Sequence, residues 1–441
     1  MAIKSKIMTV ISVAALCCTA GIACATPKIQ HWQSESGAKV LFVEDHNIPM
    51  LDVSVNFAAG SSFDAVDKAG VASLTRRLMA LGVTGMSEDD IASGMADIGA
   101  VLGGDFGQDM AGVSVRTLSQ AEVRDQALDI MARVLQTPVF PEDVLAREKT
   151  RTIAALKDAE TKPGPISNRA FRKAIYGDHP YGLMSEVDSV EKITVADIQD
   201  FYRTHYNSGK AVVAIMGDVS RQLAEQIAEN LTAKLPASDA MHSLPEVAMQ
   251  IASSEQRIKH PATQSHILVG APGMSRTDAD YTVLYVGNYI LGGGGFVSRL
   301  MEEVREQRGL AYSVYSYFMP LKQPGLFQIG LQTKKEQADE ALLLVRKTLS
   351  DFIEHGPTEK ELQAAKDNII GGFPLRINSN RKIIGYLGVI GYYDLPLTYL
   401  DDFTDKVEKV TVEQIQDAFS RRINPEAMAT VIVGAPEEAT Q

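Results

Sequence analysis

The chain has 441 residues, of which 45% are hydrophobic and 22% charged, and its formal net charge is −12. This length exceeds one ordinary domain, and the composition is typical of a globular protein that buries a sizeable core. Nucleic acid and anionic membranes are bound by basic surfaces. Because this chain is acidic, we expect neither as a partner. Beyond the first 25 residues, no stretch is long and apolar enough to predict a membrane span.

The first 25 residues have the organisation of a secretory signal peptide. Lys4 and Lys6 precede a short apolar run, and the run ends in Ala-Cys-Ala before Thr26. This pattern predicts export and cleavage between Ala25 and Thr26, and therefore a periplasmic location. The alternatives, a retained anchor or a lipoprotein, fit less well because the run is short and ends in small residues. Cleavage would remove two lysines and no acid, which changes the net charge from −12 to −14. It would also remove every cysteine of the chain, namely Cys17, Cys18 and Cys24.

Residues 51–79 predict a strand, a glycine-containing turn and an amphipathic helix. The segment "AGVASLTRRLM" (69–79) places small and apolar residues on one helical face, with Arg76 and Arg77 adjacent in its second turn. Residues 113–136 predict a strand followed by a helix. Residues 137–156 predict a further helix that opens after a proline.

The same series of elements recurs in the second half of the chain. Residues 190–217 align without a gap with residues 407–434, at an offset of 217, and 11 of the 28 positions are identical. Each copy predicts a helix capped by a threonine, Thr194 or Thr411, then a loop and an apolar strand that ends in glycine. The alternative, two unrelated helix–strand units, does not account for this identity. Upstream, three more pairs of segments match: 51–61 with 266–275, 113–136 with 327–350, and 137–156 with 355–373.

Strands mixed with long amphipathic helices, without strict alternation, predict an α+β fold. We expect two homologous halves, each an antiparallel-rich sheet covered by helices. The predicted boundaries are a signal peptide at 1–25, an N-terminal domain at 26–235, a linker at 236–254 and a C-terminal domain at 255–441. A repeat of about 210 residues is far longer than the repeats of a solenoid.

Three motifs carry a resemblance to a known family. They are "NFAAGSSFD…AGVASL" in the first half, "GDHPYG" at 177–182 and "LGGGGFVSRLMEEVREQRGLAYSVYS" at 291–316. With them the chain resembles the insulinase/pitrilysin metallopeptidases, which include the mitochondrial processing peptidase and the core subunits of the bc1 complex. The resemblance covers nearly all of the mature chain. It implies a processing-peptidase-like fold that pairs into a clamshell.

The zinc motif of that family is degenerate here. Active members carry H-x-x-E-H on the first helix, with two histidines for zinc and a glutamate as general base. The resemblance places Ser73, Arg76 and Arg77 at these positions, and arginine neither binds a dication nor accepts a proton. The third ligand, a glutamate on a later helix, would fall at Ala154 or Ala155. We therefore expect no catalytic residue and no metal in this chain.

The histidines offer no other metal site. The chain has eight histidines, and no two of them lie within four residues of each other, so ligand spacing is lacking. His179, in "GDHPYG", is expected to organise a turn. No Ser/His/Asp or Cys/His constellation is visible, which places an independent enzyme with other chemistry last among the interpretations.

The second half keeps residues that the family uses on substrate. The resemblance assigns an arginine and a tyrosine, seven residues apart, to peptide near the metal, and Arg305 and Tyr312 have this spacing. Arginine can donate paired hydrogen bonds to a carbonyl, and tyrosine can stabilise an oxyanion. The structural alternative makes them a solvated helix charge and a strand aromatic, and Arg308 is a rival for the arginine role. The preceding glycines have no phosphate-binding signature and predict a flexible turn. These glycines are Gly292, Gly293, Gly294 and Gly295.

Together these features predict a non-catalytic, substrate-binding subunit of a periplasmic heterodimeric zinc peptidase. The resemblance implies a homologous partner subunit that carries the zinc, a peptide substrate in a shared chamber, and a peptide strand added to a sheet edge. The alternative is a stand-alone peptide-binding or scaffold protein, like the bc1 core subunits. Peptidase activity is expected only with the partner.

Overall fold

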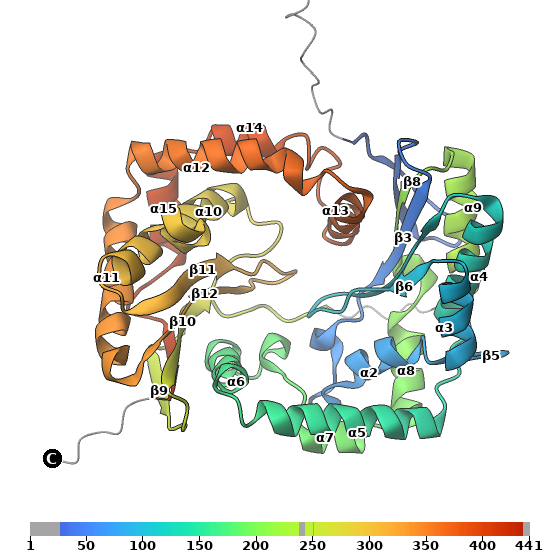
Figure 1. Ribbon diagram of the computed structural model, residues 1–441, viewed down its shortest axis with the longest axis horizontal. Helices are drawn as coiled ribbons and strands as arrows, with labels where there is room; N and C mark the ends of the chain where they lie inside the picture. Colours follow the sequence, from blue (N-terminus) through green and yellow to red (C-terminus); the bar gives the residue numbers. More distant parts are fainter. Residues whose placement is uncertain (1–26, 238–242, 250, 435–441) are drawn as a thin grey trace, which may run out of the picture.

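The computed structural model describes residues 27–237, 243–249 and 251–434, and it contains two large sheets covered by helices (Figure 1). The predicted signal peptide lies outside the described residues, as does part of the predicted linker. Between the two sheets, the first half ends with helix α9 at Thr232 and the second begins with strand β9 at Ser254.

The first sheet has six strands in the order β1-β2-β8-β3-β7-β6. Strand β2 runs parallel to β8, and the other neighbours are antiparallel. A separate two-stranded hairpin, β4-β5, follows the first helix. The strands are β1 Gln30–Gln33, β2 Lys39–Glu44, β3 Met50–Phe57, β4 Gly82–Val83, β5 Met86–Ser87, β6 Val101–Gly103, β7 Ala111–Leu118 and β8 Val212–Gly217.

The second sheet repeats this topology. Its five strands follow the order β9-β13-β10-β12-β11, which matches β2-β8-β3-β7-β6 strand for strand. The parallel pair also recurs, since β9 runs parallel to β13. The prediction of two similar antiparallel-rich halves is thereby confirmed. The strands are β9 Ser254–Ile258, β10 Gln264–Pro272, β11 Ala311–Phe318, β12 Leu326–Lys334 and β13 Ala429–Val433.

The helices also correspond between the halves. Helix α15 lies at the position of α8 shifted by 217 residues, and both begin with a threonine capping box, at Thr194 and Thr411. The helices of the first half are α2 Val71–Leu78, α3 Glu88–Asp97, α4 Ala121–Gln136, α5 Glu142–Ala159, α6 Pro163–Tyr176, α7 Val187–Lys192, α8 Val195–His205 and α9 Arg221–Thr232. Those of the second are α10 Tyr281–Asn288, α11 Ala338–His355, α12 Glu359–Gly372, α13 Asn380–Tyr392, α14 Phe403–Glu408 and α15 Val412–Arg422.

One helix from each half crosses to the sheet of the other half. Helix α13 packs on β2, β3 and β8, while α6 packs on β10 and β13 (Figure 1). The alternation of side chains along a strand explains how each sheet serves two cores. In β2, Leu41 and Val43 face the core that contains α13, whereas Val40 and Phe42 face the core of their own half. The halves are therefore interlocked rather than merely adjacent.

A buried carboxylate also ties the halves together. Asp109, only 1% exposed, accepts a hydrogen bond from the Tyr181 hydroxyl at 2.6 Å and one from the Tyr393 hydroxyl at 2.9 Å. The backbone N–H of Lys322 donates a third bond at 2.7 Å. Because burial without partners would penalise this charge, the three donors from both halves are required to keep it satisfied.

No helix of the described residues combines the length and the apolar character that a membrane span needs.

Candidate functional site

Helix α2, where the family places its zinc motif, is held at its N-terminus by a partly buried acid. Asp64, from the preceding turn, accepts hydrogen bonds from the backbone N–H groups of Gly70 at 2.7 Å and Ala72 at 2.8 Å. Burial raises the pKa of Asp64 to about 6, although both hydrogen bonds favour its charged form. A carboxylate in this position satisfies amides that the first helical turn leaves free.

Arg76 has a structural role in this helix. Its guanidinium donates to the carbonyl oxygen of Gly103 at 2.6 Å and to that of Gly112, so it fastens α2 to strands β6 and β7. Burial holds the pKa of Arg76 below its usual value, with the charges of Tyr206 and Asp105 opposing the change. At the position of the general base, the chain therefore has a cation whose Nε and Nη2 groups already donate to backbone carbonyls.

Arg77, at the position of the second histidine, pairs with an acid of helix α5. Its Nη1 lies 3.2 Å from a carboxylate oxygen of Glu148, whose side chain is 2% exposed. The other carboxylate oxygen receives Arg151 at 2.7 Å and Arg147 at 3.1 Å. Burial disfavours ionisation of Glu148, but the arginines outweigh it, and its pKa lies below the usual range. One buried anion thus has three cationic partners.

The predicted third-ligand positions lie on the same helix. Ala154 and Ala155 are exposed on α5, and neither side chain can bind a metal. Ser73 is partly buried on α2. Among the described residues, no group of three or more histidine, cysteine, aspartate or glutamate side chains is arranged to hold a metal ion. The residues that occupy the zinc positions therefore do not fit a zinc ion. Glu148 was missed in the sequence, although the flanking Arg147 and Arg151 were a signal for it.

The structure brings Arg305 and Tyr312 together. The guanidinium carbon of Arg305 lies 4.8 Å from the centroid of the Tyr312 ring, and Tyr312 is 81% exposed. The same guanidinium lies 4.7 Å from the centroid of Phe296, which is 65% exposed and was not singled out from the sequence. The carboxylate beside Arg305 is that of the adjacent Glu306, at 3.3 Å. Cation–π contacts with both rings fix the guanidinium while leaving it within reach of a ligand.

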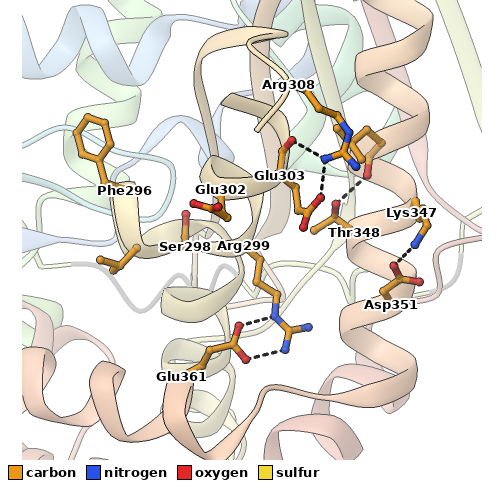
Figure 2. A pocket seen from close by; sticks show the side chains of 12 residues that line it. Phe296, Ser298, Arg299, Glu302, Glu303, Arg308, Lys347, Thr348, Asp351 and Glu361 are labelled. Atoms are coloured by element: carbon orange, nitrogen blue, oxygen red, sulfur yellow. Dashed lines mark hydrogen bonds and ion pairs between the residues drawn. The ribbon is translucent and has the colours of Figure 1, made fainter. Parts of the chain in front are cut away.

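Arg308, the rival, is committed elsewhere. Its Nη1 donates to the Glu303 carboxylate at 2.7 Å and to the Glu303 carbonyl at 3.0 Å, as Figure 2 shows. Both residues line a charged cavity of about 430 Å³ between the segment 296–308 and helix α11. In the same cavity Arg299 makes a two-pronged ion pair with Glu361, at 2.6 and 2.7 Å (Figure 2). The geometry therefore favours Arg305 over Arg308 for the predicted role.

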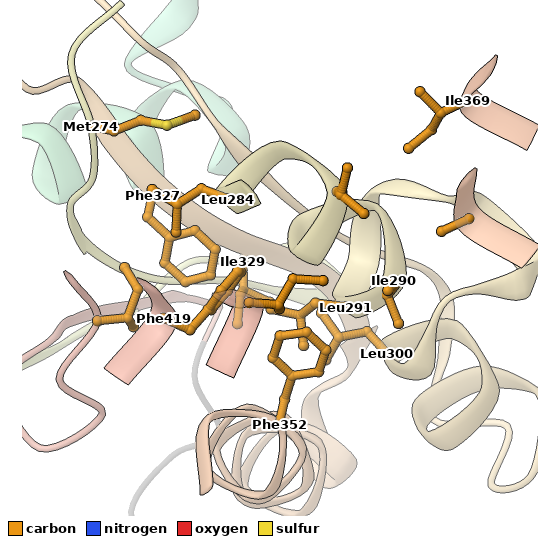
Figure 3. Packing of buried hydrophobic residues seen from close by; sticks show 14 of the residues in the cluster. Met274, Leu284, Ile290, Leu291, Leu300, Phe327, Ile329, Phe352, Ile369 and Phe419 are labelled. Carbon is orange, nitrogen blue, oxygen red and sulfur yellow. The ribbon is translucent and has the colours of Figure 1, made fainter. Parts of the chain in front are cut away.

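The glycine segment is partly helical and closely packed. Residues Tyr289–Gly293 form a π-helical turn, and a second one spans Met301–Glu306. A Cβ atom on Gly292 would collide with Ser316, and only Gly295 of the four glycines has a positive φ, of 64°. The segment is anchored on both sides by Ile290, Leu291 and Leu300, which pack in the core near Phe352 (Figure 3). Gly292, Gly293 and Gly294 thus meet neighbouring atoms that leave no room for a side chain. The predicted flexible turn stays a prediction, and Gly295, with open space around it, is its best candidate.

His179 organises a turn, as the sequence suggested. Its Nδ1 accepts a hydrogen bond from the backbone N–H of Tyr181 at 3.0 Å, and its Nε2 lies 2.9 Å from the carbonyl oxygen of Pro245. The turn it stabilises places Tyr181 against Asp109. His179 thereby contributes to the contact between the halves.

Comparison with known proteins identifies the family. Residues 39–186 match the family described as insulinase (peptidase family M16), and residues 192–369 match the peptidase M16 inactive domain. A crystal structure of a peptidase M16 inactive domain from Pseudomonas fluorescens is 40% identical, with a TM-score of 0.89, over 92% of this chain and 98% of that one. The chain therefore belongs to the peptidase M16 family, and the resemblance found in its sequence is confirmed.

One further relative and one protein of similar fold extend the comparison. The non-peptidase homolog YmxG of Helicobacter pylori is 26% identical over 387 residues, which cover 87% of this chain and 89% of that protein. The fold also resembles that of the periplasmic protease PqqL from Escherichia coli, with 16% identity and a TM-score of 0.78. That match covers 93% of this chain but 46% of the PqqL chain. The same fold is thus found both as a chain of this size and as part of a longer one.

Proposed function

We propose that the chain is the non-catalytic, substrate-binding subunit of a periplasmic heterodimeric zinc peptidase. Its partner would be a homologous subunit with an intact H-x-x-E-H helix, whose zinc activates the attacking water. The observation that carries the proposal is the contrast between two positions. Arg76 and Arg77, at the zinc positions, bond to groups of the first half, whereas the partly buried Arg305 lies against the exposed Tyr312.

The chemistry of this pair suits a peptide held in a partner's active site. Arg305 can donate a forked pair of hydrogen bonds that converge on one backbone carbonyl oxygen, and Tyr312 can donate to the oxyanion that forms when that peptide bond is attacked. The relatives named as an inactive domain and as a non-peptidase homolog support a non-catalytic role for this chain. Periplasmic location rests on the predicted signal peptide alone.

The test is reconstitution with the zinc subunit. Tyr312→Phe removes only a hydroxyl, and we expect peptide cleavage by the assembled pair to fall at least about tenfold, since one oxyanion donor is worth about 10²–10³ in turnover. Arg305→Ala should mainly raise KM, because it removes a donor to the peptide backbone. Arg308→Ala is the matched control and should leave cleavage unchanged, because its partner is Glu303.

The result that contradicts the proposal is equally specific. If both variants assemble normally and cleave at the wild-type rate, the pair does not touch substrate. The chain would then be a scaffold or a stand-alone peptide-binding protein. Complex formation is followed by size-exclusion chromatography, so that loss of assembly is not mistaken for loss of substrate contact.

A further inference from the structure

A small cavity in the second half has an unusual set of side chains. It measures about 300 Å³ and lies between α10, α13, the turn Phe373–Arg376 and the start of α14. Three cations line it, and no carboxylate does. Four tyrosines supply much of the remaining surface: Tyr281, Tyr285, Tyr386 and Tyr399. The three cations are Arg276, Arg376 and Lys382.

This concentration of positive charge stands out in an acidic protein. The chain has 55 acidic and 43 basic residues, yet no carboxylate of the described residues forms an ion pair with Arg276 or Arg376. The two acids that follow Arg276 closely in the sequence are paired with other arginines. Asp278 and Asp280 pair with Arg422 at 2.8 and 3.1 Å, and Asp280 also pairs with Arg421. The cavity therefore keeps an uncompensated positive potential.

Arg276 also has an unused donor. Its Nε is buried and has no hydrogen-bond partner, while its Nη1 donates to the Tyr281 hydroxyl at 3.0 Å. The guanidinium carbon lies 5.6 Å from the ring centroids of both Tyr281 and Tyr393, so aromatic rings hold it in place. A buried donor without an acceptor is costly, and such groups in native proteins call for an explanation.

Arg376 lines the same cavity from the turn Phe373–Arg376. It is exposed on the turn after α12, and its guanidinium carbon lies 5.7 Å from the centroid of the Tyr285 ring. Burial raises the pKa of Tyr285 and of Tyr386, and the charge of Arg376 opposes this rise in both. Lys382 donates to the Leu375 carbonyl oxygen at 2.6 Å and to the Asn378 side chain at 3.1 Å. It therefore adds positive charge to the cavity, but its ammonium group is already hydrogen-bonded. The two arginines contact tyrosines, and neither forms an ion pair with an acid of the described residues.

We propose that this cavity binds a small organic carboxylate with an aromatic or apolar body. The carboxylate accepts hydrogen bonds from Arg276 and Arg376, and the body packs against the tyrosine rings. A planar guanidinium matches the two oxygens of a carboxylate, and tyrosine rings offer apolar surface with a polar rim. The volume is at the lower end of the range for ligand sites, which suits a single residue-sized ligand. This inference is independent of the proposed peptidase partnership.

The same chemistry has two sources, a free aromatic acid and the C-terminal residue of a peptide. Titration calorimetry on the isolated full-length mature chain distinguishes them. The probes are N-acetyl-L-phenylalanine, its amide, the peptide Ala-Ala-Phe with a free carboxylate, and the same peptide amidated. We expect one-to-one saturable binding of at least one acid and binding of its amide that is weaker by roughly tenfold or more, because the amide lacks the charge. The tighter of the two acids identifies the source.

Variants connect the binding to the cavity. Arg276→Gln and Arg376→Gln should each weaken binding of the acid by roughly tenfold or more. Arg381→Gln is the matched control, because it removes one charge from helix α13 at an exposed position outside the cavity, and binding should be unchanged. If Arg276→Gln fails to fold, the exposed Arg376 still provides the test. Equal affinity for acid and amide, no saturable binding of either acid, or equal weakening by Arg381→Gln overturns the proposal.

Discussion

At the scale of single residues, two arginines occupy positions on helix α2 where active members of the family have a glutamate and a histidine. Arg76 fastens α2 to two strands through carbonyl oxygens, and Arg77 neutralises the buried Glu148. These hydrogen bonds and ion pairs within the chain make the helix part of the stabilising framework of the first half.

Glu148→Gln is expected to destabilise the protein by about 1–3 kcal/mol, because several charge-assisted hydrogen bonds are lost. The cost should stay below the 3–5 kcal/mol or so of a fully buried pair, since Arg77, Arg147 and Arg151 all reach solvent. Denaturant unfolding measures it. Glu303→Gln, which breaks the more exposed pair with Arg308, is the control and should cost at most about 1 kcal/mol.

The effect of Glu148 should depend on pH with a defined sign. Its folded-state pKa lies below the ordinary value of 4.5, so its contribution is fully present above pH 4.5 and is lost as pH falls through the lowered pKa. The difference in unfolding free energy between wild type and Glu148→Gln should therefore be constant near neutrality and shrink in acid. A difference that grows as pH falls would contradict this assignment.

At the level of residues, the family resemblance supplied an arginine and a tyrosine seven positions apart, and the structure places Arg305 beside Tyr312. Their role on substrate stays a prediction. Phe296, Glu148 and Asp64 were not identified. Their roles depend on contacts across the fold, and only Glu148, between Arg147 and Arg151, had a signal in the neighbouring sequence.

At the scale of elements, the crossing of α6 and α13 is the main feature that the sequence could not give. The repeat predicted α8 and α15, which match position for position, since capping and periodicity are local. It did not predict α6 or α13. Which sheet a helix covers is a tertiary choice. The apolar face of α13 could cover either sheet. The structure shows that it covers the first sheet, where Gly388 and Gly391 pack closely against its strands.

The two glycines at 385 and 391 of helix α13 provide a matched test of this crossing. A Cβ atom on Gly391 would overlap Val212 and Leu41 of the first sheet, whereas one on Gly385 would meet nothing within 4 Å. Gly391→Ala should therefore destabilise the protein by about 1–3 kcal/mol through overpacking. Gly385→Ala should stabilise it by up to about 1 kcal/mol, because alanine favours helix. Thermal unfolding of the two variants compares the same substitution on one helix. Equal effects would mean that α13 does not rest on the first sheet.

At the scale of the whole molecule, the two halves are joined into one unit. Shared hydrogen bonds at Asp109 and the exchanged helices oppose separation of the halves within the chain. A chamber that opens and closes, as the clamshell proposal requires, would then lie between two such chains. The absence of cysteine after residue 25 leaves this unit dependent on packing and hydrogen bonds alone.

The purified mature protein is expected to hold no stoichiometric zinc and to cleave no peptide by itself. At the zinc positions it has Ser73, Arg76 and Arg77, and two of these carry a permanent positive charge that repels a dication. Elemental analysis after dialysis against a weak chelator measures the metal, and a fluorogenic peptide measures cleavage. The zinc-carrying partner, treated in the same way, is the positive control for both measurements.

Adding zinc to this chain should not raise its melting temperature, because a ligand stabilises a protein only when it binds the folded state. One tightly held zinc per chain, or a melting temperature that rises with zinc concentration, would show that a metal site exists outside α2. The chain would then be a candidate enzyme in its own right, and the division of labour between two subunits would have to be abandoned.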